Sequence, residues 1–175
     1  MGALQEKGTD TMLLIVWHSR TGTARAMAQA AFDAAREEGE PGSLNVRLME
    51  AGLAQPADCL AAQGFLFVCP ENLGGLSGVM KEFFDRCYYP LLGRIEGRAY
   101  ATAIAAGTAG QGAQGQIDRI VTGWRLRRVA PPCLLVTGAD RPETILADKT
   151  VSEAALAPCR DLGRLMAAGL GMGAF

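Results

Sequence analysis

The chain has 175 residues, of which 49% are hydrophobic, and it carries a formal net charge of −1. This length and composition suit one domain with its own hydrophobic core, and so small a net charge gives no electrostatic reason to expect nucleic acid or an anionic membrane as a partner. No apolar run approaches the ~20 residues that a membrane-spanning helix needs. We therefore expect a cytoplasmic protein with a loose polar tail over residues 1–11 and a single domain over residues 12–175.

The first predicted element is a strand over Met12–Trp17, a continuous apolar run of the kind that is buried on both faces of a parallel sheet. The hydroxyl- and glycine-rich segment Ser19–Thr23 follows, and helical spacing of apolar residues then runs from Met27 to Ala35. A strand that leads through such a turn into a helix N-terminus forms an anion site. The first helical N–H groups have no partner within the helix, and the helix dipole is positive there. We therefore predict a phosphate site at this turn.

Four further apolar runs predict strands, and loops separate them from the segments that follow. The strands are expected at Asn45–Met49, Gly64–Cys69, Arg98–Ala106 and Cys133–Thr137. The first of these lies nearer the sheet edge, because its side chains alternate in character along the strand. Turn-forming and polar residues predict loops at Glu37–Gly42, Pro70–Gly75, Gly107–Gly115 and Gly138–Thr150.

Helices are expected between these strands. A short helix covers Pro56–Ala62, and a longer one has Ser77 as its N-cap and ends near Tyr88 and Tyr89, because Pro90 disfavours helix in the residue before it. The next helix carries an apolar stripe from Ile117 to Trp124, and its end bears three arginines that suit the helix dipole, Arg125, Arg127 and Arg128. The last helix begins near Ser152, and Pro158 is expected to kink or break it.

The alternation of strands and helices predicts an α/β fold, a doubly wound five-stranded parallel sheet with helices on both faces. In such sheets, ligands bind beyond the carboxyl ends of the strands, where the strand order reverses. The loops Ser19–Thr23, Pro70–Gly75 and Gly107–Gly112 all follow strand ends. One ligand can therefore contact all three loops.

Other motifs were weighed against this interpretation. Gly110, Gly112 and Gly115 form G-x-G-x-x-G, but the pattern follows the fourth strand, whereas a dinucleotide site carries it on the first βα turn. The chain contains neither G-x-x-x-x-G-K-[ST] nor G-x-S-x-G, which argues against a P-loop and a serine hydrolase. Because the five cysteines form no C-x-x-C pair and the only histidine is His18, we expect reduced, mostly buried thiols and no metal site.

Three motifs in order resemble those of a known family. HSRTGTAR, at residues 18–25, resembles the phosphate loop of flavodoxin-like proteins. PENLGGLSGVMKEFFDR, at 70–86, resembles the second flavin loop and following helix of NAD(P)H-dependent FMN reductases and related quinone reductases, and GTAGQG, at 107–112, resembles their third loop. The resemblance extends from Met12 to about Met166. It implies the flavodoxin-like strand order 2-1-3-4-5 and FMN as the cofactor.

The resemblance also implies which residues hold FMN. The phosphate would lie against Ser19, Arg20, Thr21, Gly22, Thr23 and Ala24. The isoalloxazine ring would lie against Pro70, Glu71, Asn72, Leu73 and Gly74, and its pyrimidine edge and the ribityl chain against Gly107, Thr108, Gly110, Gln111 and Gly112. Two positions depart from the family pattern. Ala24 stands where a threonine is frequent, and Leu73 stands where an aromatic side chain would stack on the flavin.

The implied function is that of an FMN-binding oxidoreductase, in which hydride passes from NAD(P)H through FMN to a quinone, flavin or similar small acceptor. We expect no catalytic acid or base, because hydride transfer requires none. The flavin face that Leu73 leaves open favours this function over the alternative, a flavodoxin-type electron-transfer protein without its own NAD(P)H reductase activity. A second alternative is an interaction module that has lost FMN, which Ala24 alone supports. The resemblance further implies a homodimer or homotetramer.

Overall fold

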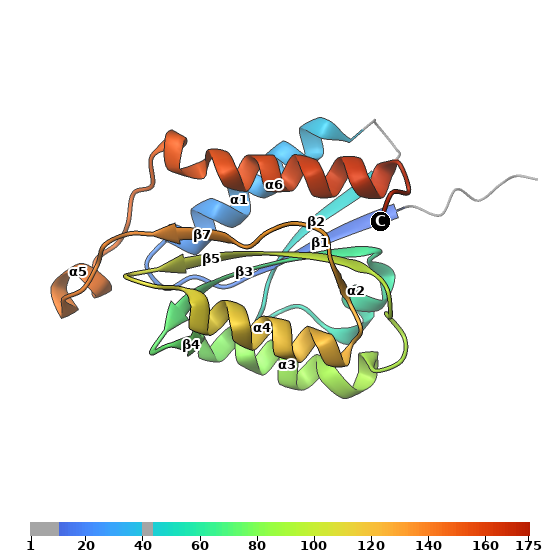
Figure 1. The fold of residues 1–175 in the computed structure, drawn as a ribbon, viewed down its shortest axis with the longest axis horizontal. Helices are drawn as coiled ribbons and strands as arrows, with labels where there is room; N and C mark the ends of the chain where they lie inside the picture. The colour runs from blue at the N-terminus through green and yellow to red at the C-terminus, as the bar shows by residue number, and fades with distance from the viewer. Residues whose placement is uncertain (1–10, 40–43) are drawn as a thin grey trace, which may run out of the picture.

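The computed structural model describes residues 11–39 and 44–175, in which helices cover both faces of a central sheet (Figure 1). The strands are Thr11–Trp17 (β1), Leu44–Glu50 (β2), Gly64–Asn72 (β3), Gly75–Leu76 (β4), Ala99–Ala106 (β5), Arg127–Arg128 (β6) and Cys133–Val136 (β7). The helices are Thr23–Glu38 (α1), Pro56–Ala61 (α2), Gly78–Leu91 (α3), Gln111–Gly123 (α4), Pro142–Leu146 (α5) and Glu153–Gly171 (α6). The tail predicted over residues 1–11 lies outside the described residues, except for Thr11, which begins β1.

The main strands run parallel in the order β2-β1-β3-β5, and β6 and β7 both pair with β5 at the far side. β6 lies beside Ala99 and Tyr100, and β7 lies beside Ala103–Ala106. Pro131 and Pro132 fall between them and have no N–H group to donate to a ladder, so the fifth strand is interrupted. With β6 and β7 counted as one interrupted strand, the predicted doubly wound parallel sheet of order 2-1-3-4-5 is confirmed.

Two apolar layers hold the helices on the sheet. α1 and α6 cover one face, and α2, α3 and α4 cover the other (Figure 1). Successive side chains of β1 alternate between the layers, with Leu13 and Ile15 in the layer of α1 and α6 and Leu14 and Val16 in the other. Burial on both faces is the reason why the central strands read as continuous apolar runs. No helix of the described part is long and apolar enough to cross a membrane.

The segment Pro70–Gly75, predicted as a loop, is the tip of a β-hairpin. β3 continues to Asn72 and pairs antiparallel with the short strand β4. Leu73 and Gly74 at the tip both have positive φ, 52° and 76°, as in a two-residue type I′ turn. Such turns prefer asparagine or glycine at the first of these positions. Because Leu73 occupies this position, the sequence lacks the usual signal of such a turn, and the hairpin could not be predicted from it.

Two prolines do not end their helices as predicted: the helix end expected before Pro90 and the break expected at Pro158 are wrong. α3 continues past Tyr88 and Tyr89 to Leu91, with Pro90 in its last turn. α6 continues through Pro158, which lies in the second turn of a helix of 19 residues. A proline inside a helix removes one backbone hydrogen bond. In α6 this loss is offset by a long buried face that packs against α1 and the sheet.

The third loop and the arginines after α4 also differ from prediction. α4 already begins at Gln111, so the loop ends at Gly110, the N-cap residue with φ of 103°. The helix ends at Gly123, before the arginines, and Arg127 and Arg128 form β6. Arg128 instead stacks its guanidinium over the Tyr100 ring, 4.7 Å from its centroid.

Two predicted loops are partly helical. Within Gly138–Thr150, the short exposed helix α5 was not predicted. Within Glu37–Gly42, α1 extends to Glu38, and residues 40–42 lie outside the described residues. Helix prediction depends on long apolar stripes. The end of α1 continues beyond its stripe, and α5 has none.

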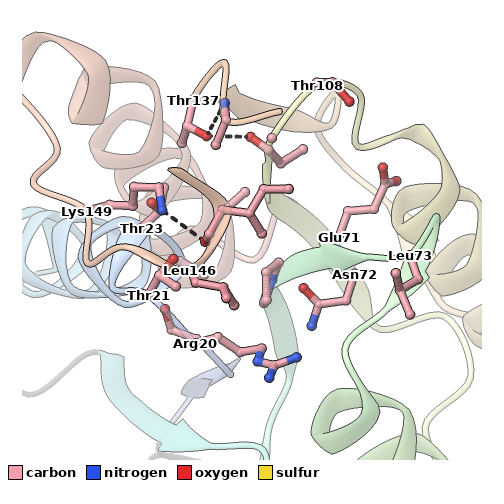
Figure 2. Close-up of a pocket in the computed structure, with 18 of the residues that line it drawn as sticks. Arg20, Thr21, Thr23, Glu71, Asn72, Leu73, Thr108, Thr137, Leu146 and Lys149 are labelled. Atoms are coloured by element: carbon pink, nitrogen blue, oxygen red, sulfur yellow. Dashed lines mark hydrogen bonds between the residues drawn. The ribbon is translucent and has the colours of Figure 1, made fainter. Parts of the chain in front are cut away.

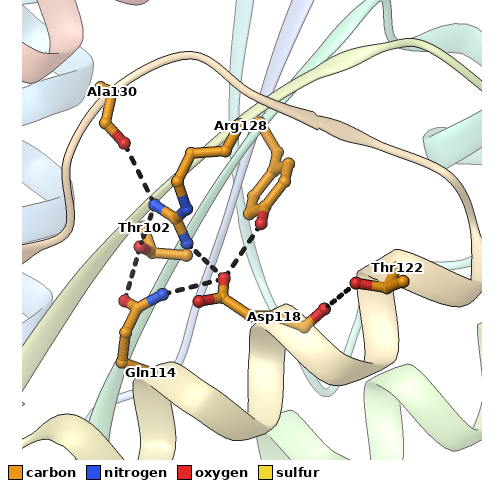
Figure 3. Close-up of polar contacts among 7 residues, drawn as sticks. Thr102, Gln114, Asp118, Thr122, Arg128 and Ala130 are labelled. Carbon is orange, nitrogen blue, oxygen red and sulfur yellow. Dashed lines mark hydrogen bonds and ion pairs between the residues drawn. The ribbon is translucent and has the colours of Figure 1, made fainter.

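Arg128 belongs to a polar network beside the interruption between β6 and β7 (Figure 3). Its guanidinium donates to the carboxylate of Asp118 and to Thr102 Oγ1, the latter at 3.1 Å. Tyr100 Oη and Gln114 Nε2 donate to the same carboxylate oxygen at 3.0 Å each. Partial burial by itself raises the pKa of Asp118, but the hydrogen bonds from Arg128, Gln114 and Tyr100 outweigh it, so the pKa is lowered.

Asp118→Asn is expected to lower the free energy of unfolding at neutral pH by about 0.5–1 kcal/mol, a small value because the carboxylate is partly exposed to solvent. A depressed pKa in the folded state means that the stabilisation is present above the ordinary value of 3.8 and is lost as pH falls through the folded pKa. Urea unfolding of both proteins at neutral and at acidic pH checks this. A difference that stays constant in acid would contradict the ionic explanation.

Candidate functional site

A cavity of about 510 Å³ opens beyond the carboxyl ends of β1, β3 and β5 (Figure 2). Four segments line it: Ser19, Arg20, Thr21, Thr23 and Ala24 from the first loop; Pro70–Gly74 from the hairpin; Ala105–Thr108 after β5; and Thr137, Ala139, Ile145, Leu146 and Lys149 after β7. Its volume is in the range of small-molecule and cofactor sites. Its position is that of ligand sites in doubly wound sheets, where the strand order reverses between β1 and β3.

The three loops predicted from the sequence converge on this cavity. All of the residues predicted from the resemblance line it except four, namely Gly22, Gly110, Gln111 and Gly112. Gly22 and Gly110 are the left-handed N-cap residues of α1 and α4. Gly112 lies where α4 meets the hairpin, because a Cβ at this position would overlap the carbonyl oxygen of Gly74. These glycines shape the loops that bear the lining residues.

The end of the cavity at α1 has the features of an anion site. Gly22, with φ of 100°, turns the chain into the helix, and its N–H donates to Ser19 Oγ at 3.1 Å. The Ser19 hydroxyl therefore orders the loop. Thr23 and Ala24 in the first helical turn line the cavity, where backbone N–H groups have no helical partner and the dipole is positive. A phosphate is the group that such a terminus binds.

Thr23 supplies the most informative atom of the site. The residue is 4% exposed, and its Oγ1 is buried without a hydrogen-bond partner among the described residues. Leaving a buried hydroxyl unsatisfied costs about 1–3 kcal/mol, and native proteins satisfy most such groups. An anion at the N-terminus of α1 would accept this hydrogen bond. The residues of the first loop therefore fit a phosphate group.

Two cations border the cavity, Lys149 from the segment after α5, drawn beside Thr23, and Arg20 from the first loop, whose guanidinium is drawn toward Asn72 (Figure 2). The Lys149 N–H donates to the carbonyl oxygen of Thr21 at 2.7 Å, which fastens this segment to the loop. Its Nζ donates to the carbonyl oxygen of Ile145 at 3.2 Å. Lys149 was not predicted, because only its tertiary contact with the first loop brings it to the site. Its signal in the sequence is a lone lysine in a polar segment after a strand end.

At the other end, Glu71 fixes the hairpin to α4. Its two carboxylate oxygens accept hydrogen bonds from the N–H groups of Gly110 and Ala113, both at 3.0 Å. The carboxylate therefore caps α4 and also meets the positive end of the helix dipole. Glu71 lines the cavity, as predicted. Its side chain holds the hairpin against the loop that precedes α4.

Aliphatic side chains occupy the walls where an aromatic ring would stack. The described residues that line the cavity include none that is aromatic. Leu73 at the hairpin tip is fully exposed and Leu146 on α5 is 70% exposed, and they border the cavity from opposite sides (Figure 2). Tyr88 packs against Trp124 and Tyr89 instead, outside the cavity lining. A flat ring bound here would meet aliphatic groups and keep part of its surface accessible.

His18 lies at the end of β1 and does not line the cavity. Its Nδ1 is 2.8 Å from the hydroxyl of Ser77, which occupies the N-cap position of α3 without capping it. Burial and then the positive charge of Arg20 lower the pKa of His18, against a smaller opposing effect of Glu50. His18 is therefore neutral at neutral pH. We assign it a structural role between the first loop and α3.

Comparison with known sequences agrees with this geometry. Residues 56–139 match the family of NADPH-dependent FMN reductases. A flavodoxin of Aquifex aeolicus is 34% identical over 101 residues, which make up 57% of this chain and 52% of that protein. The chain thus spans about half the length of this curated relative. The residues that match the FMN reductase family, 56–139, contain the hairpin and the third loop.

Solved structures share the fold over nearly the whole chain. A flavodoxin from the domain Archaea superposes with a TM-score of 0.72 at 15% identity, over 91% of this chain and 99% of that one. The rubredoxin oxygen:oxidoreductase of Desulfovibrio gigas superposes with a TM-score of 0.70 at 12% identity, over 94% of this chain and 37% of that one. At such identities the likeness shows the fold alone. The predicted flavodoxin-like fold and the resemblance to the FMN reductases are confirmed.

Proposed function

We propose that this flavodoxin-like chain, whose residues 56–139 match the NADPH-dependent FMN reductases, binds FMN in the cavity and reduces a small acceptor with NAD(P)H. The observation that carries the proposal is the buried, unpartnered hydroxyl of Thr23 at the N-terminus of α1. When bound, FMN supplies the hydride and electron chemistry, and the acceptor is a quinone, a free flavin or a similar molecule. The protein supplies binding and orientation.

The residues of the chain divide this task between the two ends of the cavity. Thr21, Thr23 and the first N–H groups of α1 hold the phosphate, and Arg20 and Lys149 add charge-assisted contacts. The hairpin tip and the loop after β5 hold the ring with backbone groups. The bonds from Glu71 to α4 keep these two ring-binding loops in a fixed relation.

The aliphatic walls favour a reductase over an electron carrier. Leu73 and Leu146 leave part of a bound ring accessible, and a nicotinamide or a quinone can stack there in turn. The carrier remains a second candidate, because the relative that is 34% identical is itself named a flavodoxin.

Anaerobic mixing of the FMN-loaded protein with NADPH, and separately with NADH, distinguishes these functions. A reductase loses its flavin absorbance with at least one of the nucleotides, faster than free FMN does, and regains it when a quinone is added. A carrier keeps its absorbance with both nucleotides and loses it with dithionite. A protein that holds no FMN at all contradicts both functions and leaves an interaction module with this fold.

We also propose that the chain forms a homodimer or homotetramer, a proposal that rests on the family resemblance. Light scattering on the eluate of a sizing column measures the mass of the assembly. A monomer would overturn this proposal without bearing on FMN binding, because all the cavity-lining residues described above come from one chain.

A further inference from the structure

Cys133 and Cys159 bring two thiols into contact on the face of the sheet that α6 covers. Cys133 is the first residue of β7, Cys159 lies on α6, and their Sγ atoms are 3.7 Å apart. The two residues are 26 positions apart in the sequence, so the packing of α6 on the sheet creates the contact. Cys159 is completely buried and Cys133 is half-buried. The pair therefore has one accessible and one protected thiol.

The accessible thiol opens on a second cavity. This groove of about 410 Å³ lies between the interrupted fifth strand and α6. It is lined by Cys133, by the acidic residue Asp161 and by apolar residues that include Pro132, Pro158 and Leu165. Cys159 is absent from this lining. A small molecule in the groove can therefore contact Cys133 but not Cys159, which lies buried behind it. An attacking thiol and a resolving thiol are arranged in this way.

The hydrogen bond between the sulfurs favours the same division of roles. The contact with Cys159 lowers the pKa of Cys133, and the same contact together with burial raises the pKa of Cys159. Thiolate character thus falls on the sulfur that the groove exposes, and the thiolate is the nucleophilic form.

We propose that Cys133 and Cys159 form a peroxide-reactive dithiol that closes to a disulfide. The Cys133 thiolate attacks one oxygen of hydrogen peroxide, so that an S–O bond forms, the O–O bond breaks, and the released hydroxide takes a proton from solvent and becomes water. The Cys159 sulfur then attacks the Cys133 sulfur. The S–S bond forms, the S–O bond breaks, and the hydroxyl leaves as water with the proton of Cys159. Two thiols are oxidised to a disulfide, and one peroxide is reduced to two waters.

The disulfide joins the two ends of the segment that forms one wall of the larger cavity. Residues 134–158 lie between the cysteines and contribute the lining residues of that wall, Thr137, Ala139, Ile145, Leu146 and Lys149. Cross-linking restricts the movement of this wall and of Lys149 relative to the first loop. This consequence for the cavity rests on the proposed function, whereas the thiol chemistry is independent of it.

Mass spectrometry of the whole protein after exposure to hydrogen peroxide tests the dithiol. We expect the loss of the mass of two hydrogen atoms and a tryptic cross-link between residues 129–149 and 150–160, which contain Cys133 and Cys159. Cys59 and Cys87 are a matched internal control. They also neighbour each other, but both are buried in the opposite layer, and they should stay reduced. The cross-link is read on the wild-type chain, so the test needs no variant that folds poorly.

Two variants separate the roles of the thiols. Cys159→Ala is expected to stop at a sulfenic acid on Cys133 that dimedone traps, and Cys133→Ala is expected to form neither the adduct nor the cross-link. Peroxide that leaves all five thiols intact, or that cross-links Cys59 to Cys87 instead, would overturn the proposal.

The link to the cavity has its own readout, the FMN affinity of the reduced and the cross-linked protein. Equal affinities would overturn the link to the cavity. A protein that binds no FMN in either state would contradict the proposed function. The tryptic cross-link would still show whether Cys133 and Cys159 form a disulfide.

Discussion

Gly112→Ala is expected to weaken FMN binding by roughly tenfold or more, because a Cβ at this position overlaps the carbonyl oxygen of Gly74. The overlapped atom belongs to the backbone of the hairpin, so no side chain can rotate to relieve the contact. Overpacking of this kind costs about 1–3 kcal/mol. The new Cβ would also lie 3.1 Å from the carboxylate of Glu71, whose bonds to α4 hold the hairpin in place. The variant therefore displaces the wall on which the flavin ring is proposed to lie.

Gly115→Ala is the matched control, one turn further along α4. A Cβ at this position meets only Arg119 Nη1, at 3.8 Å. Because alanine favours helix over glycine, we expect unchanged FMN binding and a free energy of unfolding that is equal or higher by about 0.5–1 kcal/mol. Flavin fluorescence titration and urea unfolding of both variants measure these effects. A Gly112→Ala variant that binds FMN like the wild type would show that the hairpin does not form the ring site.

The double variant Arg20→Ala and Lys149→Ala is expected to lose FMN affinity by roughly a hundredfold, with about tenfold from each residue. A hydrogen bond to a charged group contributes about 1.5–3 kcal/mol, and the lower part of this range applies to side chains with access to solvent. Riboflavin lacks the phosphate, so its affinity should change little. Titrations with both flavins at two salt concentrations measure the difference. The loss of FMN affinity should be smaller at high salt, where charges are screened.

Arg25→Ala is the control for this pair. Arg25 is an exposed residue in the first turn of α1 that does not line the cavity. Its removal takes away the same charge from the neighbourhood without a direct contact to the proposed phosphate. We expect an effect of less than about threefold, because exposed charges are strongly screened. If Arg25→Ala lowered FMN affinity as much as either cavity variant, the effect would come from the overall positive potential and not from specific contacts with the phosphate.

The sheet and the first loop could be predicted because their signals are local. The run Met12–Trp17 is apolar since both faces of β1 are buried, and Thr23 begins α1 directly after the hydroxyl-rich turn. The hairpin at Leu73 could not be predicted in the same way, because a leucine occupies a left-handed position that normally signals its turn through asparagine or glycine. The helix α5 is short and exposed, and so it lacks an apolar stripe.

The remaining differences depend on tertiary contacts that no local pattern encodes. Lys149 reaches the site only because its backbone bonds to Thr21. The role of Glu71 as the cap of α4 depends on two N–H groups that lie about forty residues further along the chain. Pro158 is itself exposed and is tolerated because the buried face of α6 is held against the core over many turns. The three-loop arrangement was predictable, whereas the partners of its side chains were not.

Equilibrium titration of the purified protein with FMN and with riboflavin, followed by flavin fluorescence, tests the central claim most directly. The claim is that the N-terminus of α1, with the free hydroxyl of Thr23, binds the phosphate of FMN in this cavity. It predicts one FMN bound per chain, with an affinity at least about tenfold higher than that for riboflavin. Equal affinities for the two flavins, or no binding of either, would contradict it.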